Sequence, residues 1–384
     1  MFVNPFTPIF GGKPDFFFGR EAVLNRFRRA LIDRGSEDRV LFITGTRGSG
    51  KTALVEQLSQ RARQHDWHTV DLGAEHLTQT LLRRLVTYDE LTKTISPQAS
   101  LSILGSGGSV SAGSISKTMS YTPDDLQTAF LKACEEHPKG VFVSIDEVQK
   151  VPLEEIAAVC EAFQLASRKG HNVILVLAGL PYAYGSIIHH EGCTFMRRGV
   201  REHIGLFAWE DTIKAFGKAF VSIDGLQVGE DEIELLASTS MGHPYLMQLH
   251  GYYLLSAVND RTNDRSYAVT REDVEEVAPL AIDAYERRAL RPMVDELNSL
   301  ERDYLKAMAI CMSEDRVAQT AAIARSLDKQ QRQLSRARGS LIGAGIILVP
   351  ARGEVMFNVP YLADYVRKPE PANEEVSLAR SWKL

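Results

Sequence analysis

Eight residues of this chain have the types and the spacing of a loop that holds a nucleoside triphosphate: Gly45-Thr46-Arg47-Gly48-Ser49-Gly50-Lys51-Thr52. Small residues allow successive backbone N–H groups to curl around a phosphate. Lys51 then supplies a positive charge near the β- and γ-phosphates, and the hydroxyl of Thr52 is a ligand that suits Mg²⁺. The pattern predicts that this glycine loop binds a nucleoside triphosphate together with Mg²⁺.

An acidic pair follows an apolar stretch further along the chain, where Val141-Phe142-Val143-Ser144-Ile145 runs directly into Asp146 and Glu147. A carboxylate at the end of such a strand complements the loop, because it holds Mg²⁺ beside the γ-phosphate. We assign that role to Asp146, together with Thr52. Glu147 is the candidate general base or water-positioning residue for hydrolysis of ATP to ADP and phosphate.

Short apolar runs separated by helical patterns are the elements that would position these side chains. The run Val40-Leu41-Phe42-Ile43 predicts a strand before the loop, and a helix is predicted to start at Ala53 after it. Other predicted strands cover residues 69–72, 141–145, 173–177 and 203–206. Continuous apolar strands that alternate with helices favour a parallel sheet with both faces covered. The predicted fold class is therefore α/β, a P-loop NTPase with a parallel sheet.

Two further domains are predicted after the sheet. Residues 209–291 have a wholly helical pattern, so we expect a helical lid domain there. The last domain combines three predicted helices with a β-hairpin, which is the composition of a winged helix. The predicted helices cover residues 304–309, 317–326 and 329–342, and the hairpin strands cover 346–349 and 355–358.

These patterns give four predicted parts. They are an N-terminal arm with the P-loop ATPase domain (1–207), the helical lid (208–296), the winged helix (297–368) and a C-terminal tail (369–384). Within the first part we expect an extended arm packed by its aromatic residues (1–17), a helix from Phe18 through Arg34, and another helix at 76–93. The Ser- and Gly-rich segment from Ser96 to Ser120 fits either a β-hairpin or a mobile loop, as a surface insertion or a partner-binding element.

Composition and charge limit the other classes of function. With 384 residues, two or three domains are expected, and the formal charge of −5 gives no global attraction to nucleic acid or to an anionic membrane. No apolar run approaches the roughly 20 residues of a membrane-spanning helix, and the first residues lack the pattern of a secretory signal. The four cysteines are scattered, which suits a reduced compartment. We therefore expect a cytoplasmic protein.

The order of these motifs resembles that of AAA+/STAND-type P-loop ATPases, near the bacterial and archaeal ATPases related to origin-recognition initiators. Besides the glycine loop and the acidic pair, the resemblance rests on Phe18-Gly19-Arg20-Glu21 and on Gly242-His243-Pro244. It implies that Phe18, Gly19 and Arg20 border the adenine, while His243 and Pro244 approach the nucleotide from the lid. ATP and Mg²⁺ would then sit at the carboxyl edge of the sheet, between the first two domains.

Two departures from that family pattern imply slow hydrolysis or a mainly switching role. Relatives place a polar sensor residue at the end of the strand after the acidic pair, whereas this chain reads Ala178-Gly179-Leu180. The lid also lacks the arginine that many AAA+ proteins use. Arg197, Arg198 and Arg201 lie just before the last predicted strand, and they are candidates to supply charge to the γ-phosphate, in cis or from a neighbouring subunit. The alternative is that they are surface arginines.

One helix of the predicted winged helix has a basic face. Leu334, Ala337, Leu341 and Ile342 share one side of it, and Lys329, Arg332 and Arg336 fall on the opposite side. Residues 298–368 contain 11 Lys and Arg against 7 Asp and Glu, a balance of +4. This favours double-stranded DNA as a partner, with Arg352 on the wing.

Three functions remain open on these observations. The first is an ATP-driven switch that acts on DNA. The second is a STAND-type signalling or defence regulator whose winged helix binds protein, with slow or negligible turnover and possible assembly into a homo-oligomer. The third is a nucleotide binder with negligible turnover.

Overall fold

The computed structural model describes residues 1–9, 17–85, 123–262 and 264–369, and the chain divides into two compact units. The first, here called the sheet unit, consists of Ile9–Gly45 and Ser49–Gly205. The second, here called the helical unit, consists of Met1–Pro8, Thr46–Gly48 and Leu206–Leu384.

The sheet unit is built on five parallel strands in the order β2-β3-β4-β1-β5. The strands are β1 (Val40–Thr44), β2 (His68–Leu72), β3 (Val141–Ile145), β4 (Val173–Gly179) and β5 (Val200–His203). Their register places Thr44 beside Gly179 and Ile145 beside Leu177, so the strands end at one common edge. The predicted α/β fold with a parallel sheet is confirmed.

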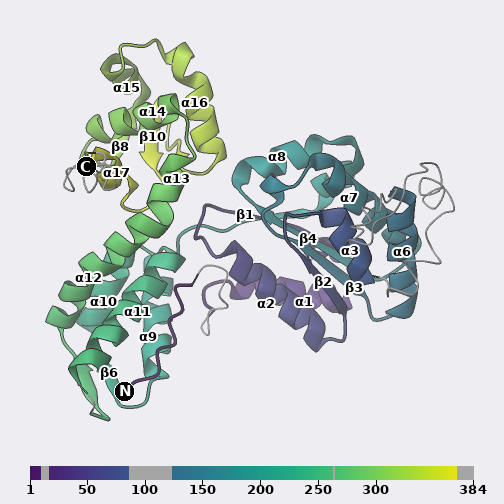
Figure 1. Cartoon of the computed structure of the whole chain (residues 1–384), viewed down its shortest axis with the longest axis horizontal. Helices are drawn as coiled ribbons and strands as arrows, with labels where there is room; N and C mark the ends of the chain where they lie inside the picture. Colours follow the sequence, from purple (N-terminus) through teal and green to yellow (C-terminus); the bar gives the residue numbers. More distant parts are fainter. Residues whose placement is uncertain (10–16, 86–122, 263, 370–384) are drawn as a thin grey trace, which may run out of the picture. The chain divides into compact units, whose positions relative to one another are not determined.

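Helices cover both faces of this sheet (Figure 1). On one face lie α1 (Glu21–Ile32) and α2 (Lys51–Gln64). On the other face lie α3 (Leu77–Leu85), α6 (Pro123–Glu136), α7 (Leu153–Arg168) and α8 (Pro181–His189). Three short 3₁₀ turns complete the described part of the unit, η1 (Glu37–Arg39), η2 (Val148–Lys150) and η3 (Glu191–Arg198).

Strand residues alternate between two apolar cores. Phe42, Val143 and Leu175 pack with α3, α6 and α7, whereas Leu41, Phe142 and Val176 pack with α1 and α2. Because successive side chains of a strand point to opposite faces, a strand buried on both faces has to be apolar throughout. This is why the continuous apolar runs predicted the sheet.

Four expectations for the sheet unit need correction or restriction. The last strand covers Val200–His203 rather than 203–206, because it pairs with β1 from Leu41 to Thr44. Helix α1 ends at Ile32, where Asp33 adopts an extended conformation, and does not reach Arg34. Only Leu77–Leu85 of the predicted helix 76–93 is described, and the segment Ser96–Ser120 lies outside the described residues.

The helical unit begins with α9 (Trp209–Val221), α10 (Glu230–Ser240), α11 (Pro244–Arg261) and α12 (Arg271–Tyr285). A π-helical turn, η4 (Glu286–Leu290), leads into α13 (Arg291–Asp295). The prediction that residues 209–291 are wholly helical is wrong, because β6 (Leu226–Val228) and β7 (Tyr267–Val269) pair as a small parallel sheet. Each of these strands has three residues, too few for an alternating pattern to separate from a loop.

The N-terminal residues pack on helices of this unit (Figure 1). The ring of Phe6 lies 5.4 Å from that of Phe220 in α9. The backbone N–H of Phe2 donates to Asn259 Oδ1 of α11 at 2.6 Å. An arm packed by its aromatic residues is therefore present over the described residues 1–9.

The C-terminal elements of the helical unit combine helices with a three-stranded antiparallel sheet of order β8-β10-β9. In chain order they are α14 (Ser299–Ile310), β8 (Val317–Gln319), α15 (Thr320–Ser326), α16 (Gln331–Gly343), β9 (Ile347–Leu348), β10 (Glu354–Phe357) and α17 (Leu362–Arg367). The predicted helix 317–326 is wrong in its first turn, because Val317–Gln319 pairs with β10. The predicted hairpin is present as β9 and β10.

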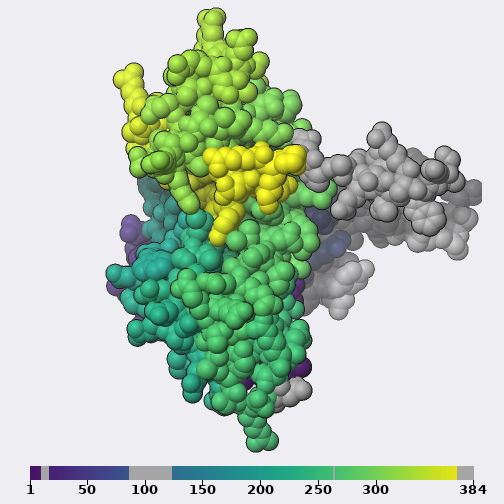
Figure 2. All heavy atoms as spheres, turned by 90° about the vertical axis from the view of Figure 1, so that its left-hand side faces the viewer, coloured from purple at the N-terminus to yellow at the C-terminus, as the bar shows by residue number. Residues whose placement is uncertain are grey.

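The C-terminal elements share an apolar core with the helices before them. Tyr304 and Leu305 of α14 belong to the same buried cluster as Leu246 of α11 and Tyr285 of α12. In Figure 2, which shows one face of the whole chain, the colours of this unit pass from teal through green to yellow at its C-terminal elements. The predicted boundary at residue 296 stays a prediction. None of the helices within the described ranges is long and apolar enough to cross a bilayer.

Candidate nucleotide site

The glycine loop turns between β1 and α2 through backbone conformations that favour glycine. Gly48 and Gly50 have φ angles of +75° and +90°, in the left-handed region. A Cβ at Gly45 would come within 2.4 Å of the carbonyl oxygen of Ile204, so a side chain does not fit there. Gly50 caps α2, and the first N–H groups of that helix therefore face the loop with the positive end of the helix dipole.

Lys51 and Ser49 are buried polar residues of this turn. The ammonium of Lys51 donates to the carbonyl oxygen of Gly45 at 3.0 Å, and the residue is 5% exposed. The hydroxyl of Ser49 is buried and has no hydrogen-bond partner among the described residues. Buried polar groups normally have partners. A cradle with a buried ammonium, a spare hydroxyl and a helix N-terminus fits a polyphosphate.

The carboxyl end of β5 adds an imidazole to the same edge of the sheet. His203 lies 3.2 Å from Thr44, measured from its Nδ1 to the hydroxyl oxygen. Burial lowers the pKa of His203, and the nearby charges of Arg201, Arg20 and Lys51 lower it further. The imidazole of His203 therefore lies close to several positively charged side chains. Sequence reasoning missed His203 as a site residue, because its place depends on a contact with Thr44, which is distant in the chain.

The segment Phe18-Gly19-Arg20 reaches this edge as well. The guanidinium of Arg20 donates to the carbonyl oxygen of Gly205 at 2.6 Å, just beyond β5. Gly19 has a φ of +71°, which lets the chain turn into α1. The structure thus brings Arg20 and Lys51 to the same end of the sheet. The adenine contact of Phe18 stays a prediction.

The two residues assigned to Mg²⁺ are in direct contact. The hydroxyl of Thr52 donates to Asp146 Oδ2 at 2.6 Å. The other carboxylate oxygen of Asp146 accepts the backbone N–H of Glu147 at 2.8 Å. The first turn of α2 and the end of β3 therefore present a hydroxyl and a carboxylate together, an oxygen donor pair that suits Mg²⁺.

Glu147 has a left-handed backbone, with φ of 55° and ψ of 39°. Its carboxylate oxygen Oε2 accepts from Gln149 Nε2 at 2.8 Å, and the Lys150 ammonium lies 3.1 Å from the same oxygen. Left-handed backbone at a residue other than glycine is uncommon and often accompanies function. Gln149 is a second residue that sequence reasoning missed, although it lies only two positions after Glu147.

The strained backbone gives a stability prediction. We expect Glu147→Gly to have a larger free energy of unfolding than Glu147→Ala, by about 1 kcal/mol, because glycine adopts this conformation without a steric penalty. Both variants lack the carboxylate, so the comparison isolates the backbone. Equilibrium unfolding in urea measures the difference.

A control at Glu154, an exposed residue in the first turn of α7, should give the opposite order. There Glu154→Gly should be less stable than Glu154→Ala, because the position is helical. If the Ala variant has a free energy of unfolding equal to or larger than that of the Gly variant at both positions, the predicted backbone strain at Glu147 is contradicted.

Other predicted residues group with the helical unit. Thr46, Arg47 and Gly48 belong to it by their contacts, as do His243 and Pro244. Within this unit a Cβ at Gly48 would come within 2.7 Å of His243 Cε1, so these two residues are neighbours. His243 is 1% exposed, and burial lowers its pKa to about 4, so the ring is neutral near pH 7. Pro244 begins α11, which His243 caps.

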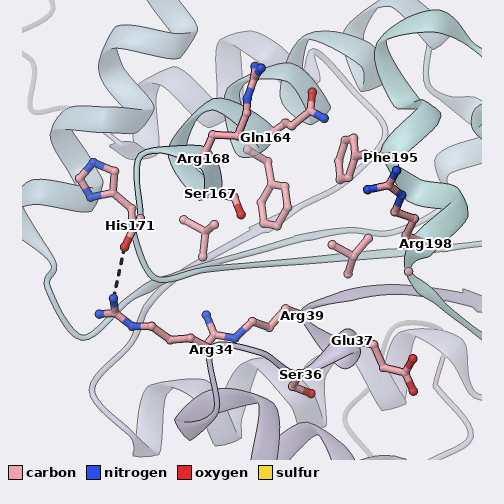
Figure 3. A pocket seen from close by; sticks show the side chains of 15 residues that line it. Arg34, Ser36, Glu37, Arg39, Gln164, Ser167, Arg168, His171, Phe195 and Arg198 are labelled. Atoms are coloured by element: carbon pink, nitrogen blue, oxygen red, sulfur yellow. Dashed lines mark hydrogen bonds between the residues drawn. The ribbon is translucent and has the colours of Figure 1, made fainter.

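The predicted arginines do not reach the glycine loop in the sheet unit. Arg198 lines a cavity of about 470 Å³, together with Arg34, Arg39 and Arg168 (Figure 3). Val40 and Val173, the first residues of β1 and β4, also line it, so this cavity lies at the amino edge of the sheet. Arg197 donates to the carbonyl oxygen of Ile188 at 2.9 Å.

Arg201, which is one of the charges near His203, makes a contact with α8. Its guanidinium lies 4.5 Å from the centre of the Tyr184 ring, a cation–π contact with α8. A role of Arg197 or Arg198 in cis therefore has no geometric support, and a role across a subunit boundary stays a prediction.

The parallel sheet, the glycine loop with its lysine after β1, and the acidic pair at the end of β3 together have the arrangement of an AAA+-type P-loop fold. Residues 17–177 match the family model of the AAA ATPase domain. The matched residues include β1, β2 and β3 of the sheet unit. Residues 287–366 match a domain of unknown function, DUF8462. Comparison with curated proteins gave no match.

Solved structures share the fold over nearly the whole chain. The Aeropyrum pernix ORC2 protein, in a structure described as ADPNP–ADP complexes, has a TM-score of 0.63 at 12% identity, over 99% of each chain. Cdc6p from Pyrobaculum aerophilum has a TM-score of 0.51 at 12% identity, over 95% of this chain and 97% of that chain. The relation to origin-recognition ATPases that the motifs indicated is confirmed at the level of fold.

Proposed function

We propose that this protein binds ATP with Mg²⁺ and hydrolyses it slowly, using the state of the nucleotide as a switch. The observation that supports this most directly is the convergence of Lys51, Thr52, Asp146 and Glu147 at one edge of the sheet unit. The ORC2 structure of the same fold, described with ADPNP and ADP, supports nucleotide binding.

Each residue has a role in this proposal. The backbone of the glycine loop and Lys51 would neutralise the phosphate charge, and Phe18, Gly19, Arg20, His243 and Pro244 would enclose the base and phosphates. Thr52 and Asp146 would hold Mg²⁺, which supplies positive charge to the phosphate oxygens. Glu147 would accept a hydrogen bond from the attacking water and orient it.

Slow turnover follows from what surrounds Glu147. Strand β4 ends at Gly179 and is followed by Leu180, so its own side chains offer no polar group to the attacking water. Any cation from Arg197 or Arg198 would have to come from a second copy of the chain.

The proposal is tested on the wild-type chain by calorimetric titration with ATP and Mg²⁺, followed by measurement of phosphate release. We expect saturable ATP binding and slow release of phosphate. Absence of heat with both ATP and GTP would overturn nucleotide binding. Binding without release would leave the third function, a nucleotide binder with negligible turnover.

We further propose that the C-terminal elements form a winged helix that contacts double-stranded DNA. Lys329, Arg332 and Arg336 are exposed before and along α16, while Leu334 and Ala337 on its other side are buried. Arg352 is exposed between β9 and β10. The positive balance of this region suits phosphates, and an exposed helix beside a hairpin suits a groove.

DNA binding by the full chain should weaken with salt, and Arg332→Ala/Arg336→Ala should weaken it further. Each phosphate contact contributes a slope of about −0.9 in log K against log salt, so loss of two contacts should reduce the slope by about 2. At low salt we expect at least a roughly tenfold loss of affinity. Fluorescence anisotropy with a labelled duplex measures both quantities.

The matched control is Arg28→Ala/Arg29→Ala, which removes the same charge from exposed positions on α1. It should leave DNA affinity unchanged. If the wild-type chain does not bind duplex DNA at low salt, the DNA role is excluded. The alternative, a STAND-type regulator whose winged helix binds protein, then becomes the leading proposal, and the glycine at the end of β4 already favours its slow turnover.

A further inference from the structure

The end of strand β4 has no polar side chain of its own, yet a polar group lies there. The backbone N–H of Leu180 donates to Gln149 Oε1 at 3.1 Å. Gln149 belongs to the turn η2 after β3, 31 residues earlier in the chain. The same amide donates through Nε2 to Glu147 Oε2 at 2.8 Å. One side chain therefore bridges the candidate water-positioning carboxylate and the end of the next strand.

The two bonds fix which way the amide points. A backbone N–H can only donate, so it selects the carbonyl oxygen of Gln149, and an ionised carboxylate can only accept, so it selects the NH₂ group. A flipped amide would lose both hydrogen bonds. Gln149 is thus oriented from both sides, and it orients Glu147 in return.

Gly179 makes this bridge sterically possible. A Cβ at that position would lie 2.7 Å from Gln149 Oε1 and 2.6 Å from Val148 Cγ2. Real Cβ atoms do not approach other atoms so closely, so any side chain at 179 would displace the amide. The glycine at the end of β4 therefore leaves the space that the side chain of Gln149 occupies.

The carboxylate of Glu147 keeps one oxygen for another partner. Gln149 and Lys150 both engage Oε2, and among the described residues Oε1 has no hydrogen bond. A carboxylate held through one oxygen presents the other in a fixed direction, and orientation of a reacting group is a large part of catalysis. The left-handed backbone of Glu147 keeps it within reach of the amide two residues later.

We propose that Gln149 is a positioning residue for hydrolysis, which holds Glu147 and supplies at the end of β4 the polar group that Gly179 cannot. The inference rests on the proposed function, in which Glu147 orients the attacking water. It goes beyond the proposed function because it assigns the orientation of Glu147 to the side-chain amide of Gln149 in the turn η2.

The test measures kcat for ATP hydrolysis and the ATP Kd in the full chain. Gln149→Leu keeps the size of the side chain without its polar atoms, and we expect kcat to fall roughly 10- to 100-fold with a Kd within about threefold of wild type. Gln149→Glu cannot donate to Glu147, so its loss in kcat should be at least as large. Thermal unfolding midpoints check that both variants are folded.

Coupling to Glu147 separates positioning from a merely structural role. In a Glu147→Gln background, Gln149→Leu should cause no further loss of kcat, because residues that act as one unit are not additive. The inference about Gln149 is overturned if Gln149→Leu lowers kcat in the Glu147→Gln background as much as in wild type, or if Gln149→Leu is as active as wild type. Either result leaves the proposed function intact. Absence of phosphate release by wild type overturns the proposed function, and the role of Gln149 with it.

Discussion

Lys51→Ala is expected to raise the Kd for ATP with Mg²⁺ by about 100-fold or more, which corresponds to roughly 2.8 kcal/mol of binding free energy. The ammonium is buried in the glycine loop and held by the carbonyl oxygen of Gly45 at 3.0 Å. A charge placed in such a low-dielectric position acts on a phosphate far more strongly than an exposed lysine does. Isothermal titration calorimetry measures the effect.

Two comparison variants make this result specific. Lys51→Met keeps most of the apolar stem, so it separates the loss of charge from the loss of volume, and it should weaken binding nearly as much. Lys139→Ala removes the same charge from an exposed position before β3 and should leave the Kd unchanged. An unchanged Kd in both Lys51 variants would mean that the glycine loop does not hold the triphosphate.

The parts of the site that the sequence predicted are those close to one another along the chain or tied to strand ends. Lys51 and Thr52 follow the loop directly, and Asp146 follows a continuous apolar strand. Because parallel strands end at a common edge, the pairing of Thr52 with Asp146 follows from topology once both strands are recognised. Their hydrogen bond at 2.6 Å agrees with that expectation.

The direction of the last strand explains why Arg197 and Arg198 lie far from the glycine loop. Arg197 and Arg198 precede β5, and a parallel strand begins at the edge opposite to the one where the glycine loop lies. The motif spacing alone did not contain this information. Their place at the amino edge, where Arg198 lines the cavity with Val40 and Val173, follows from the order of elements.

Two neighbours of the site could not be predicted, because each depends on a contact between distant residues. His203 meets Thr44 across 159 positions, and Gln149 meets Leu180 across 31. Hydrophobic periodicity reports burial but not which polar groups meet. The short strands β6, β7 and β8 were missed for a related reason: each is defined by its pairing partner, not by a pattern of its own.

Glu147→Gln is expected to reduce phosphate release by about 10²- to 10⁴-fold while ATP binding stays intact. The substituted side chain has the same shape and still accepts a hydrogen bond from Gln149 through its carbonyl oxygen. It lacks the negative charge that orients and polarises the attacking water. Since Lys51, Thr52 and Asp146 are untouched, the triphosphate and Mg²⁺ should bind as in wild type. Single-turnover phosphate release and calorimetry separate the two steps.

Glu154→Gln serves as the matched control, because it neutralises an exposed carboxylate in the first turn of α7, a few residues from the site. Its rate should equal that of wild type. Equal rates for Glu147→Gln and wild type would remove catalysis by Glu147 and, with it, the need for Gln149 to position that carboxylate. The hydrogen bonds of η2 would then serve only to join β3 to β4. Conversely, loss of turnover with retained affinity in Glu147→Gln, and no further loss on adding Gln149→Leu, would place both residues in one hydrolytic unit.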